Sequence, residues 1–140
     1  MAQDDNIATQ ESFAERVVKG GDLDAIDELV SPDFVDHDPA PDQGPGPAGF
    51  KDFWGAFRTA FPDLAVQVDH SVADEDCVAL AYRASGTHQG DFHGIAATGK
   101  PIDVRGMQIT RFVDAKMVER WGSSDELSIL KQIGAEQIPS

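Results

Sequence analysis

Residues 106–125 read GMQITRFVDAKMVERWGSSD and predict a strand, a tight turn, a second strand and the start of a helix. Asp114-Ala115 is the expected two-residue turn, although Asp-Gly would suit a type I′ turn better. Counting outward from this turn predicts cross-strand pairs whose side chains share one face of the sheet: Val113–Lys116, Phe112–Met117, Thr110–Glu119 and Gln108–Trp121. A slip of one residue would move each side chain to the opposite face.

The second strand leads into a short helix. Ser123 and Glu126 have the spacing of a capping box, which predicts a helix from Asp125 to Ile133 that Gly134 ends. Asp125 therefore lies where the sheet ends, and we expect the rest of the chain to form a pocket around it.

Three helices are expected before the sheet, because apolar residues recur at helical spacing in residues 7–19, 22–30 and 47–61. Residues 33–49 hold four prolines and three glycines and are expected to be an irregular loop. The third helix carries a stripe of aromatic side chains, which is typical of a core face and also suits the wall of an apolar pocket: Phe50, Phe53, Trp54, Phe57 and Phe61.

Beyond Pro62 the apolar period changes from helical spacing to alternation, which predicts strands at 64–72, 77–88 and 102–113 besides the one after the turn. Helices, four antiparallel strands and a short last helix predict an α+β fold. We expect a cone-shaped α+β barrel, with the N-terminal helices packed in a curved, mainly antiparallel four-stranded sheet. A single domain over residues 1–140 is expected, with residues 1–6 as a flexible N-terminus.

The strand at 102–113 has two different faces. Gln108 and Thr110 are polar residues on its apolar side, and we expect them to line the cavity and orient a carbonyl group. The opposite face carries Met107 and Ile109. Apolar residues on an outer sheet face often mark an interface, so a homodimer packed through this face is predicted.

The net charge is −14, and its whole excess lies in residues 1–76, which hold 18 acidic and 4 basic side chains. Such a surface repels phosphate backbones and anionic lipids, so nucleic-acid binding and membrane docking are not expected. The acidic start lacks the features of a secretory signal, which favours a cytoplasmic location. Cys77 is the single cysteine, and no Cys/His spacing indicates a zinc site.

Several segments share a family pattern: GTHQGDFHGI at 86–95, TGKP at 98–101, Arg111-Phe112, the E-x-W-x-x-x-D spacing of 119–125, DFVDHDP at 33–39 and FPD at 61–63. With these segments the chain resembles the SnoaL-like polyketide cyclase (ester cyclase) family over roughly residues 10–134. Ala115 replaces the common turn glycine, and Ala97 stands where a proline often precedes Thr-Gly.

The resemblance implies a cone of the nuclear transport factor 2-like superfamily. Characterised family members close a ring by intramolecular aldol condensation without a metal or a cofactor, so none is expected here, and the substrate would be a small apolar polyketide-like molecule. The resemblance places the acid/base role on Asp125. The superfamily also houses epoxide hydrolases, isomerases, dehydratases and non-enzymatic modules, so the fold alone does not determine the activity.

An aldol closure needs a base and a group that stabilises the developing oxyanion, and Asp125 and His88 are the candidates. An apolar cavity lined by Trp54, Phe57 and Trp121 would raise the pKa of Asp125 by desolvation. A helix dipole would instead lower the pKa of an ordinary first-turn carboxylate. His88 is equally well explained as a hydrogen-bonded histidine at the end of a strand.

Phe34 and His37 complete the candidate substrate-binding residues. Because adjacent residues cannot all point at one ion, His37 is expected to fix its loop or the pocket mouth rather than bind a metal. Two alternatives stay open: an epoxide hydrolase or dehydratase-like enzyme on the same cone, and a non-catalytic module that binds small molecules. A cavity with Asp125 and His88 both facing inward favours an enzyme, whereas Asp125 as a solvent-facing cap favours the binding module.

Overall fold

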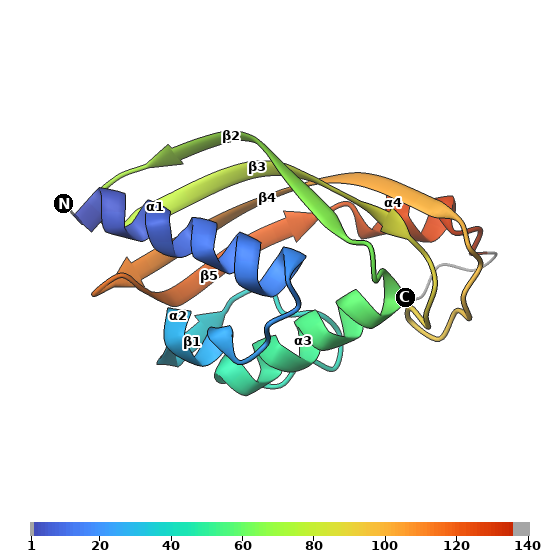
Figure 1. Ribbon diagram of the computed structural model, residues 1–140, viewed down its shortest axis with the longest axis horizontal. Helices are drawn as coiled ribbons and strands as arrows, with labels where there is room; N and C mark the ends of the chain where they lie inside the picture. The colour runs from blue at the N-terminus through green and yellow to red at the C-terminus, as the bar shows by residue number, and fades with distance from the viewer. Residues whose placement is uncertain (1, 136–140) are drawn as a thin grey trace.

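A computed structural model describes residues 2–135 of the chain (Figure 1). Its helices and strands follow one another as α1 (Ala2–Phe13), η1, a π-helix (Ala14–Lys19), α2 (Ala25–Leu29), β1 (Val30–Asp36), α3 (Gly46–Ala60), β2 (Ala65–Ala73), β3 (Cys77–Thr87), β4 (Pro101–Val113), β5 (Lys116–Ser124) and α4 (Glu126–Gln132). The predicted α+β architecture, with helices packed against a curved sheet, is confirmed.

The sheet has five strands in the order β1-β5-β4-β3-β2 rather than the predicted four. The extra strand is β1, which runs parallel to β5, whereas all other neighbours are antiparallel. The segment from residue 33 was expected to be a loop, and that prediction is wrong as far as Asp36. Pro32 is compatible with β1 because an edge strand has one side free of ladder hydrogen bonds.

The β4–β5 hairpin begins as predicted. Asp114 and Ala115 have φ of 52° and 60°, the positive values of a type I′ turn. The pairs Val113–Lys116 and Phe112–Met117 are confirmed.

The register then shifts between Arg111 and Phe112, because β5 contains one extra residue, a β-bulge. The observed pairs beyond it are Arg111–Glu119, Thr110–Arg120, Ile109–Trp121, Gln108–Gly122 and Gly106–Ser124. The predicted pairs Thr110–Glu119 and Gln108–Trp121 are therefore wrong. Arg120 and Gly122 share the inner face with Thr110 and Gln108, and Glu119 and Trp121 lie on the outer face.

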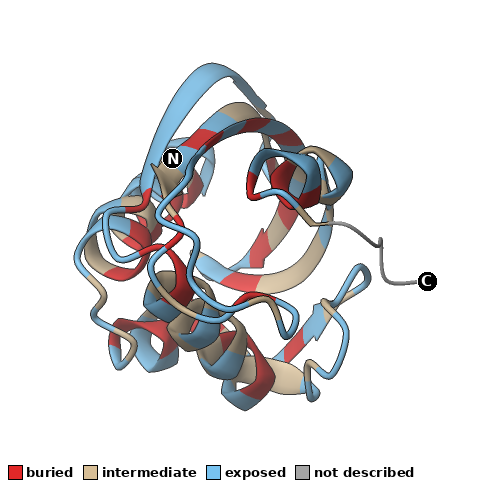
Figure 2. Ribbon diagram, turned by 90° about the vertical axis from the view of Figure 1, so that its right-hand side faces the viewer, coloured by how far each residue is buried: buried red, intermediate tan, exposed pale blue. Residues whose placement is uncertain are grey.

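The core lies between the helices and the inner face of the sheet. Figure 2 shows the sheet curling in an arc, with buried and exposed residues alternating along its strands. On β4 the buried members include Ile102, Val104 and Phe112, which confirms the predicted faces of this strand. The largest fully buried apolar side chains include Phe61 and Ile26.

Helix α1 starts earlier than the apolar pattern predicted. Residues 2–6, expected to be flexible, are helical. Asn6 Nδ2 donates to the carbonyl of Glu75 at 2.9 Å, and Thr9 Oγ1 donates to the carbonyl of Ala115 at 2.7 Å. These two bonds fasten α1 to the β2–β3 and β4–β5 turns. Within residues 2–135, no helix has both the length and the apolar character needed to cross a membrane.

Candidate active site

The helices and the inner face of the sheet enclose an apolar chamber of about 110 Å³. Its apolar wall comes from α1, α3, α4 and the sheet and includes Phe13, Phe34, Phe50, Trp54, Phe57, Leu80, Met117 and Ile129. A smaller set of polar residues interrupts this wall: Gln10, Tyr82, Gln108, Thr110, Arg120, Ser124 and Glu126. Mostly apolar walls with a few placed polar groups are typical of small-molecule sites.

A second, more polar cavity of about 380 Å³ adjoins the chamber, between the loop after β1 and the start of α4. We call it the mouth. The residues that line the mouth but not the chamber include Asp36, Asp38, Gln43 and Asp125. Six residues line both spaces: Phe50, Phe53, Trp54, Arg120, Ser124 and Glu126. The mouth and the chamber therefore share a wall, and Arg120 and Glu126 are its charged members.

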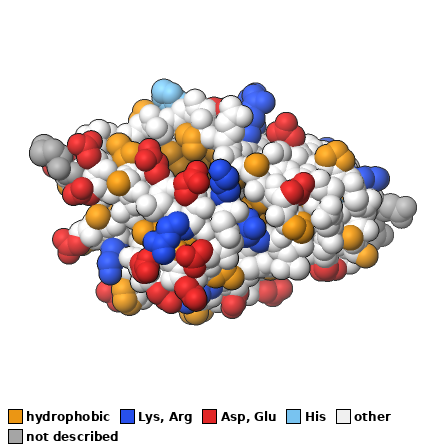
Figure 3. Space-filling view, viewed as in Figure 1, with side chains coloured by type: hydrophobic (Ala, Val, Ile, Leu, Met, Phe, Trp, Pro, Cys, Tyr) orange, Lys and Arg blue, Asp and Glu red, His pale blue; other side chains and the backbone are white. Residues whose placement is uncertain are grey.

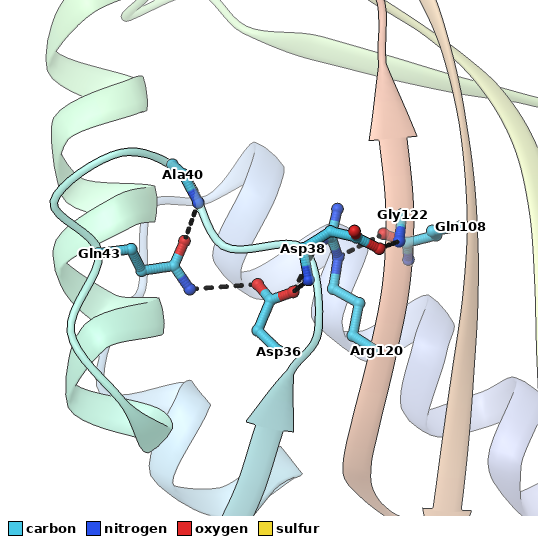
Figure 4. Close-up of polar contacts among 7 residues, drawn as sticks. All are labelled: Asp36, Asp38, Ala40, Gln43, Gln108, Arg120 and Gly122. Atoms are coloured by element: carbon cyan, nitrogen blue, oxygen red, sulfur yellow. Dashed lines mark hydrogen bonds and ion pairs between the residues drawn. The ribbon is translucent and has the colours of Figure 1, made fainter.

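Arg120 is held between two elements (Figure 4). Its Nε donates to Gln108 Oε1 on β4 at 3.2 Å, and its Nη1 donates to Asp36 Oδ1 at the end of β1 at 3.0 Å. Gln43 Nε2 donates to the second oxygen of Asp36 at 3.1 Å. The side chain of Asp36 is only 6% exposed, so the ion pair is largely desolvated and Arg120 has one fixed position.

Tyr82 projects from β3 into the same end of the chamber. Burial raises the pKa of its phenol above the ordinary value, while the charge of Arg120 and the nearby hydroxyl of Ser124 act in the opposite direction. Because the net direction is upward, the phenol stays protonated at neutral pH and can donate a hydrogen bond.

Two buried polar atoms on the chamber residues have no hydrogen-bond partner within the described chain: the indole nitrogen Nε1 of Trp54 and the amide oxygen Oε1 of Gln10. A buried polar group without a partner costs free energy. These atoms offer one donor and one acceptor that an oxygenated ligand could satisfy.

Asp125 lies at the mouth but acts as the N-cap of α4, which begins at Glu126, one residue after the predicted start. Its Oδ1 accepts from the Ser128 amide at 3.0 Å and its Oδ2 accepts from Ser128 Oγ at 2.7 Å. These bonds, the hydroxyl contribution being the larger, hold the pKa of Asp125 below its ordinary value. Ser123, the predicted cap, belongs to β5.

His88 does not lie beside Asp125, and it lines neither the chamber nor the mouth. The ring is fully buried, and its Nδ1 accepts from the amide of Thr98 at 3.2 Å and lies 2.9 Å from Thr98 Oγ1. The proton is therefore on Nε2, which is buried without a partner among the described residues. This geometry fastens the loop before β4 to the end of β3.

His37 and Trp121 lie on the other side of the sheet from the chamber. Their rings stack with centroids 4.7 Å apart, and His37 Nε2 lies 2.8 Å from Glu119 Oε2. Hydrogen bonds with His37 and then Arg111 hold the pKa of Glu119 below its ordinary value. The predicted position of Trp121 in the pocket wall is wrong because the β5 bulge turns it outward, and His37 fixes the loop after β1.

Five of the predicted substrate-binding residues line the chamber: Phe34, Trp54, Phe57, Gln108 and Thr110. Arg120 and Asp36 were not predicted. Tyr82 could have been found, because it stands on the apolar side of an alternating strand, but a single tyrosine in such a stripe is more often part of the core.

An α+β cone whose helices and curved sheet enclose an apolar chamber with a polar end is a small-molecule-binding architecture of the nuclear transport factor 2-like kind. The family model described as SnoaL-like polyketide cyclase matches residues 8–133. The chain therefore belongs to the SnoaL-like polyketide cyclase family, which supports a cyclase-type function and a small-molecule substrate.

Solved structures resemble the chain over nearly its whole length. IdmH from Streptomyces antibioticus, described as a proposed polyketide cyclase, is 32% identical with a TM-score of 0.79, covering 93% of this chain and 99% of that one. AclR from Streptomyces galilaeus, described as a proposed hydroxylase, is 30% identical with a TM-score of 0.83 and coverage of 98% and 99%.

TsrD from Streptomyces laurentii, 23% identical with a TM-score of 0.84 and coverage of 94% and 96%, shares the fold. A comparison with curated proteins gave no match.

Proposed function

We propose that this protein is an acid/base enzyme that closes a ring in a small apolar polyketide-like substrate by an intramolecular aldol-type reaction or a related isomerisation. The observation that carries the proposal is the apolar chamber whose two charged residues, Arg120 and Glu126, line the wall that it shares with the mouth. The apolar part of a substrate would fill the chamber, and its reacting carbonyl groups would lie at the polar end.

Asp125 is the proposed base, as the family resemblance implies. The hydrogen bonds from Ser128 keep its pKa low, so its carboxylate is ionised at neutral pH but is a weak base. A weak base suffices where the proton lies on a carbon between two carbonyl groups, since that proton is acidic. The neighbouring Glu126 lines both the mouth and the chamber and provides a second carboxylate at the same place.

A non-catalytic binding module is the second candidate. The observation that favours it is the capping of α4 by Asp125, which occupies both carboxylate oxygens with Ser128. In that case the chamber would bind the same class of molecule, and the carboxylate would only stabilise the helix.

The two candidates differ in the effect of Asp125→Asn. Asparagine caps helices as well as aspartate does, so the variant should keep the melting temperature within a few degrees. Loss of a general base should lower turnover of a β-polyketone methyl ester by about 10²–10⁴-fold, measured by the appearance of the cyclised product. Glu126→Gln is the matched carboxylate control and should retain most of the activity.

Full turnover by Asp125→Asn would reject Asp125 as the base. Turnover lost only in Glu126→Gln would move the role to the neighbouring carboxylate. Binding of β-polyketone esters by the wild-type protein without any product would favour the binding module.

We also propose that two copies associate through the outer face of the sheet. On this face Met107 is 66% exposed, Ile109 45% and Trp121 38%. The family's small-molecule chemistry does not require this association, so its test is independent of turnover.

A further inference from the structure

We propose that Tyr82 and Arg120 together bind the substrate oxygen that becomes negatively charged during the reaction, and that the reacting part of the substrate is a 1,3-dicarbonyl group that is neutral when it binds. This inference rests on the proposed function, since it names the group that the chamber would hold. Nothing in the family match assigns a role to either residue.

The strand pairing brings the two side chains together. Tyr82 on β3 pairs with Gly106 on β4, and Gly106 pairs with Ser124 on β5, so these three residues form one row across the inner face. Arg120 starts two rows away, opposite Thr110. Its guanidinium reaches back to Gln108 and lies near enough to Tyr82 for its charge to act on the phenol.

Two glycines provide the space for this meeting. A Cβ atom on Gly106 would overlap the phenol oxygen of Tyr82. A Cβ atom on Gly122 would lie 2.5 Å from Nη2 of Arg120. Each donor therefore lies flat against the sheet over a residue without a side chain, and both line the chamber.

Each residue has a hydrogen atom left for a ligand. Within residues 2–135 the Tyr82 hydroxyl makes no hydrogen bond, and arginine has no acceptor atom, so the phenol hydrogen remains free for a ligand. Nε and Nη1 of Arg120 bond to Gln108 and Asp36, while Nη2 has no acceptor among the residues that the structure describes. Fixed donors aimed at one point stabilise an oxyanion without reorganisation.

The charges at this end select a neutral ligand. Asp36 already balances the charge of Arg120, and its buried position keeps the pair intact. Glu126 adds a carboxylate to the same wall and has no ion pair within residues 2–135. A carboxylate ligand would therefore meet a net negative site. A dicarbonyl binds without charge, and the carboxylate that takes its proton is neutralised as the enolate forms.

The step is balanced without any further reactant. The proton on the carbon between the two carbonyls moves to the carboxylate base at the mouth, and the electron pair of that C–H bond passes onto a carbonyl oxygen. Tyr82 and Arg120 hold this enolate oxygen while the carbon attacks a second carbonyl, whose π electrons pass to its own oxygen. That oxygen then takes the proton back from the carboxylic acid at the mouth.

The test is the pKa of benzoylacetone, a 1,3-diketone, bound to the protein. Carbonyl-labelled benzoylacetone is titrated by ¹³C NMR with the protein in excess. The wild-type protein should lower the pKa of the bound diketone by about one unit or more, which means that the enolate binds about tenfold more tightly than the neutral form. A carboxylate of similar size, 4-phenylbutanoate, should bind more weakly than the diketone.

Tyr82→Phe keeps the ring over Gly106 and removes only the hydroxyl, so most of the pKa shift should disappear while the fold is kept. Arg120→Lys keeps the charge opposite Asp36 but loses the planar fork, and it should also reduce the shift. Thr59→Val is the matched control, because its hydroxyl bonds to the carbonyl of Gly55 on α3 and lies away from the chamber.

An unchanged diketone pKa, no binding of benzoylacetone, a shift in Tyr82→Phe equal to that of the wild type, or tighter binding of 4-phenylbutanoate would each overturn the inference. Different outcomes reject the proposed function and the oxyanion site. A clear shift without cyclisation of any polyketone would reject the cyclase and leave the oxyanion site, whereas turnover without a shift would reject the oxyanion site alone.

Discussion

At the scale of single residues, Gly122 decides where the guanidinium of Arg120 lies. Its amide also donates to Asp38 Oδ2 at 2.8 Å, which connects β5 to the loop after β1. Because the hydrogen atom at Cα is the only substituent on that side, Arg120 can lie along the strand between Gln108 and Tyr82. The position of one polar group in the chamber thus depends on a residue that makes no side-chain contact.

Gly122→Ala should therefore displace Arg120 without unfolding the protein. The overlapping atom is the tip of a flexible side chain, so we expect the free energy of unfolding to fall by about 1 kcal/mol. The pKa shift of bound benzoylacetone should be largely lost, because the Nη2 donor moves away. Chemical denaturation and the ¹³C titration measure the two effects.

Gly44→Ala is the control, since nothing lies within 4 Å of a Cβ atom built there. It should leave the diketone pKa unchanged and raise the stability slightly through the entropy of the unfolded chain. If Gly122→Ala kept the full pKa shift, Arg120 would not be one of the donors.

At the scale of elements, the turn of the β4–β5 hairpin carries backbone strain. Ala115 has a φ of 60°, in the left-handed region, which costs a residue with a Cβ atom roughly 1–2 kcal/mol. The carbonyl of Ala115 is fixed by Thr9 of α1, so the turn cannot relax to another type without losing that bond.

Ala115→Gly should raise the free energy of unfolding by about 1 kcal/mol, because glycine adopts this conformation without strain. Urea denaturation measures the change. Ala97→Gly, at an exposed position whose φ is not positive, is the control and should lower the stability slightly through the entropy of the unfolded chain. A lower stability of Ala115→Gly would show that the turn is not strained.

The same hairpin shows what a sequence pattern can and cannot predict. The turn and the first two pairs depend on local residues, and both were predicted correctly. The bulge depends on distant partners: Arg111 and His37 hold Glu119 on the outer face, and Asp36 holds Arg120 on the inner face. Alternation of Met117, Glu119 and Trp121 gives no sign of these contacts, so the pattern predicted the wrong face.

The same contrast between local residues and distant partners explains the predictions for strand β1 and for the site. The α+β cone and the buried face of β4 follow from periodicity, which is a local property. Strand β1 depends on pairing with β5, more than eighty residues away in the sequence, and its proline resembled a loop signal. Consequently the apolar lining was largely predicted, whereas the ion pair of Asp36 and Arg120, which joins two misassigned segments, was not.

At the scale of the whole molecule, the net charge is spread unevenly along the chain. Acidic and basic side chains intermingle over the face that carries α1 and α3 (Figure 3), where Arg16 pairs with Asp22 and Glu28. The excess of acidic residues lies in residues 1–76, while residues 77–140, which form β3, β4 and β5, hold seven acidic and seven basic residues. Two copies with a net charge of −14 repel each other least where the charge is balanced.

This balanced region includes the exposed apolar residues of β4 and β5, so we expect the chain to elute at twice its mass of 15.1 kDa in size-exclusion chromatography with light scattering. Met107→Asp should shift the protein toward the monomer, because it places a charge at the centre of the apolar face. Leu127→Asp, which alters an equally apolar side chain, 44% exposed, in the first turn of α4, should remain dimeric.

The effect of salt on the dissociation constant distinguishes this apolar interface from a purely electrostatic one. Added sodium chloride screens the repulsion between the acidic regions of the two copies, while burial of apolar surface is not weakened by screening. The dimer should therefore become tighter as the salt concentration rises, and the dissociation constant from sedimentation equilibrium should fall. A wild-type monomer at all salt concentrations, or equal dissociation by Leu127→Asp, would contradict association through β4 and β5 and leave the chamber as a site within one chain.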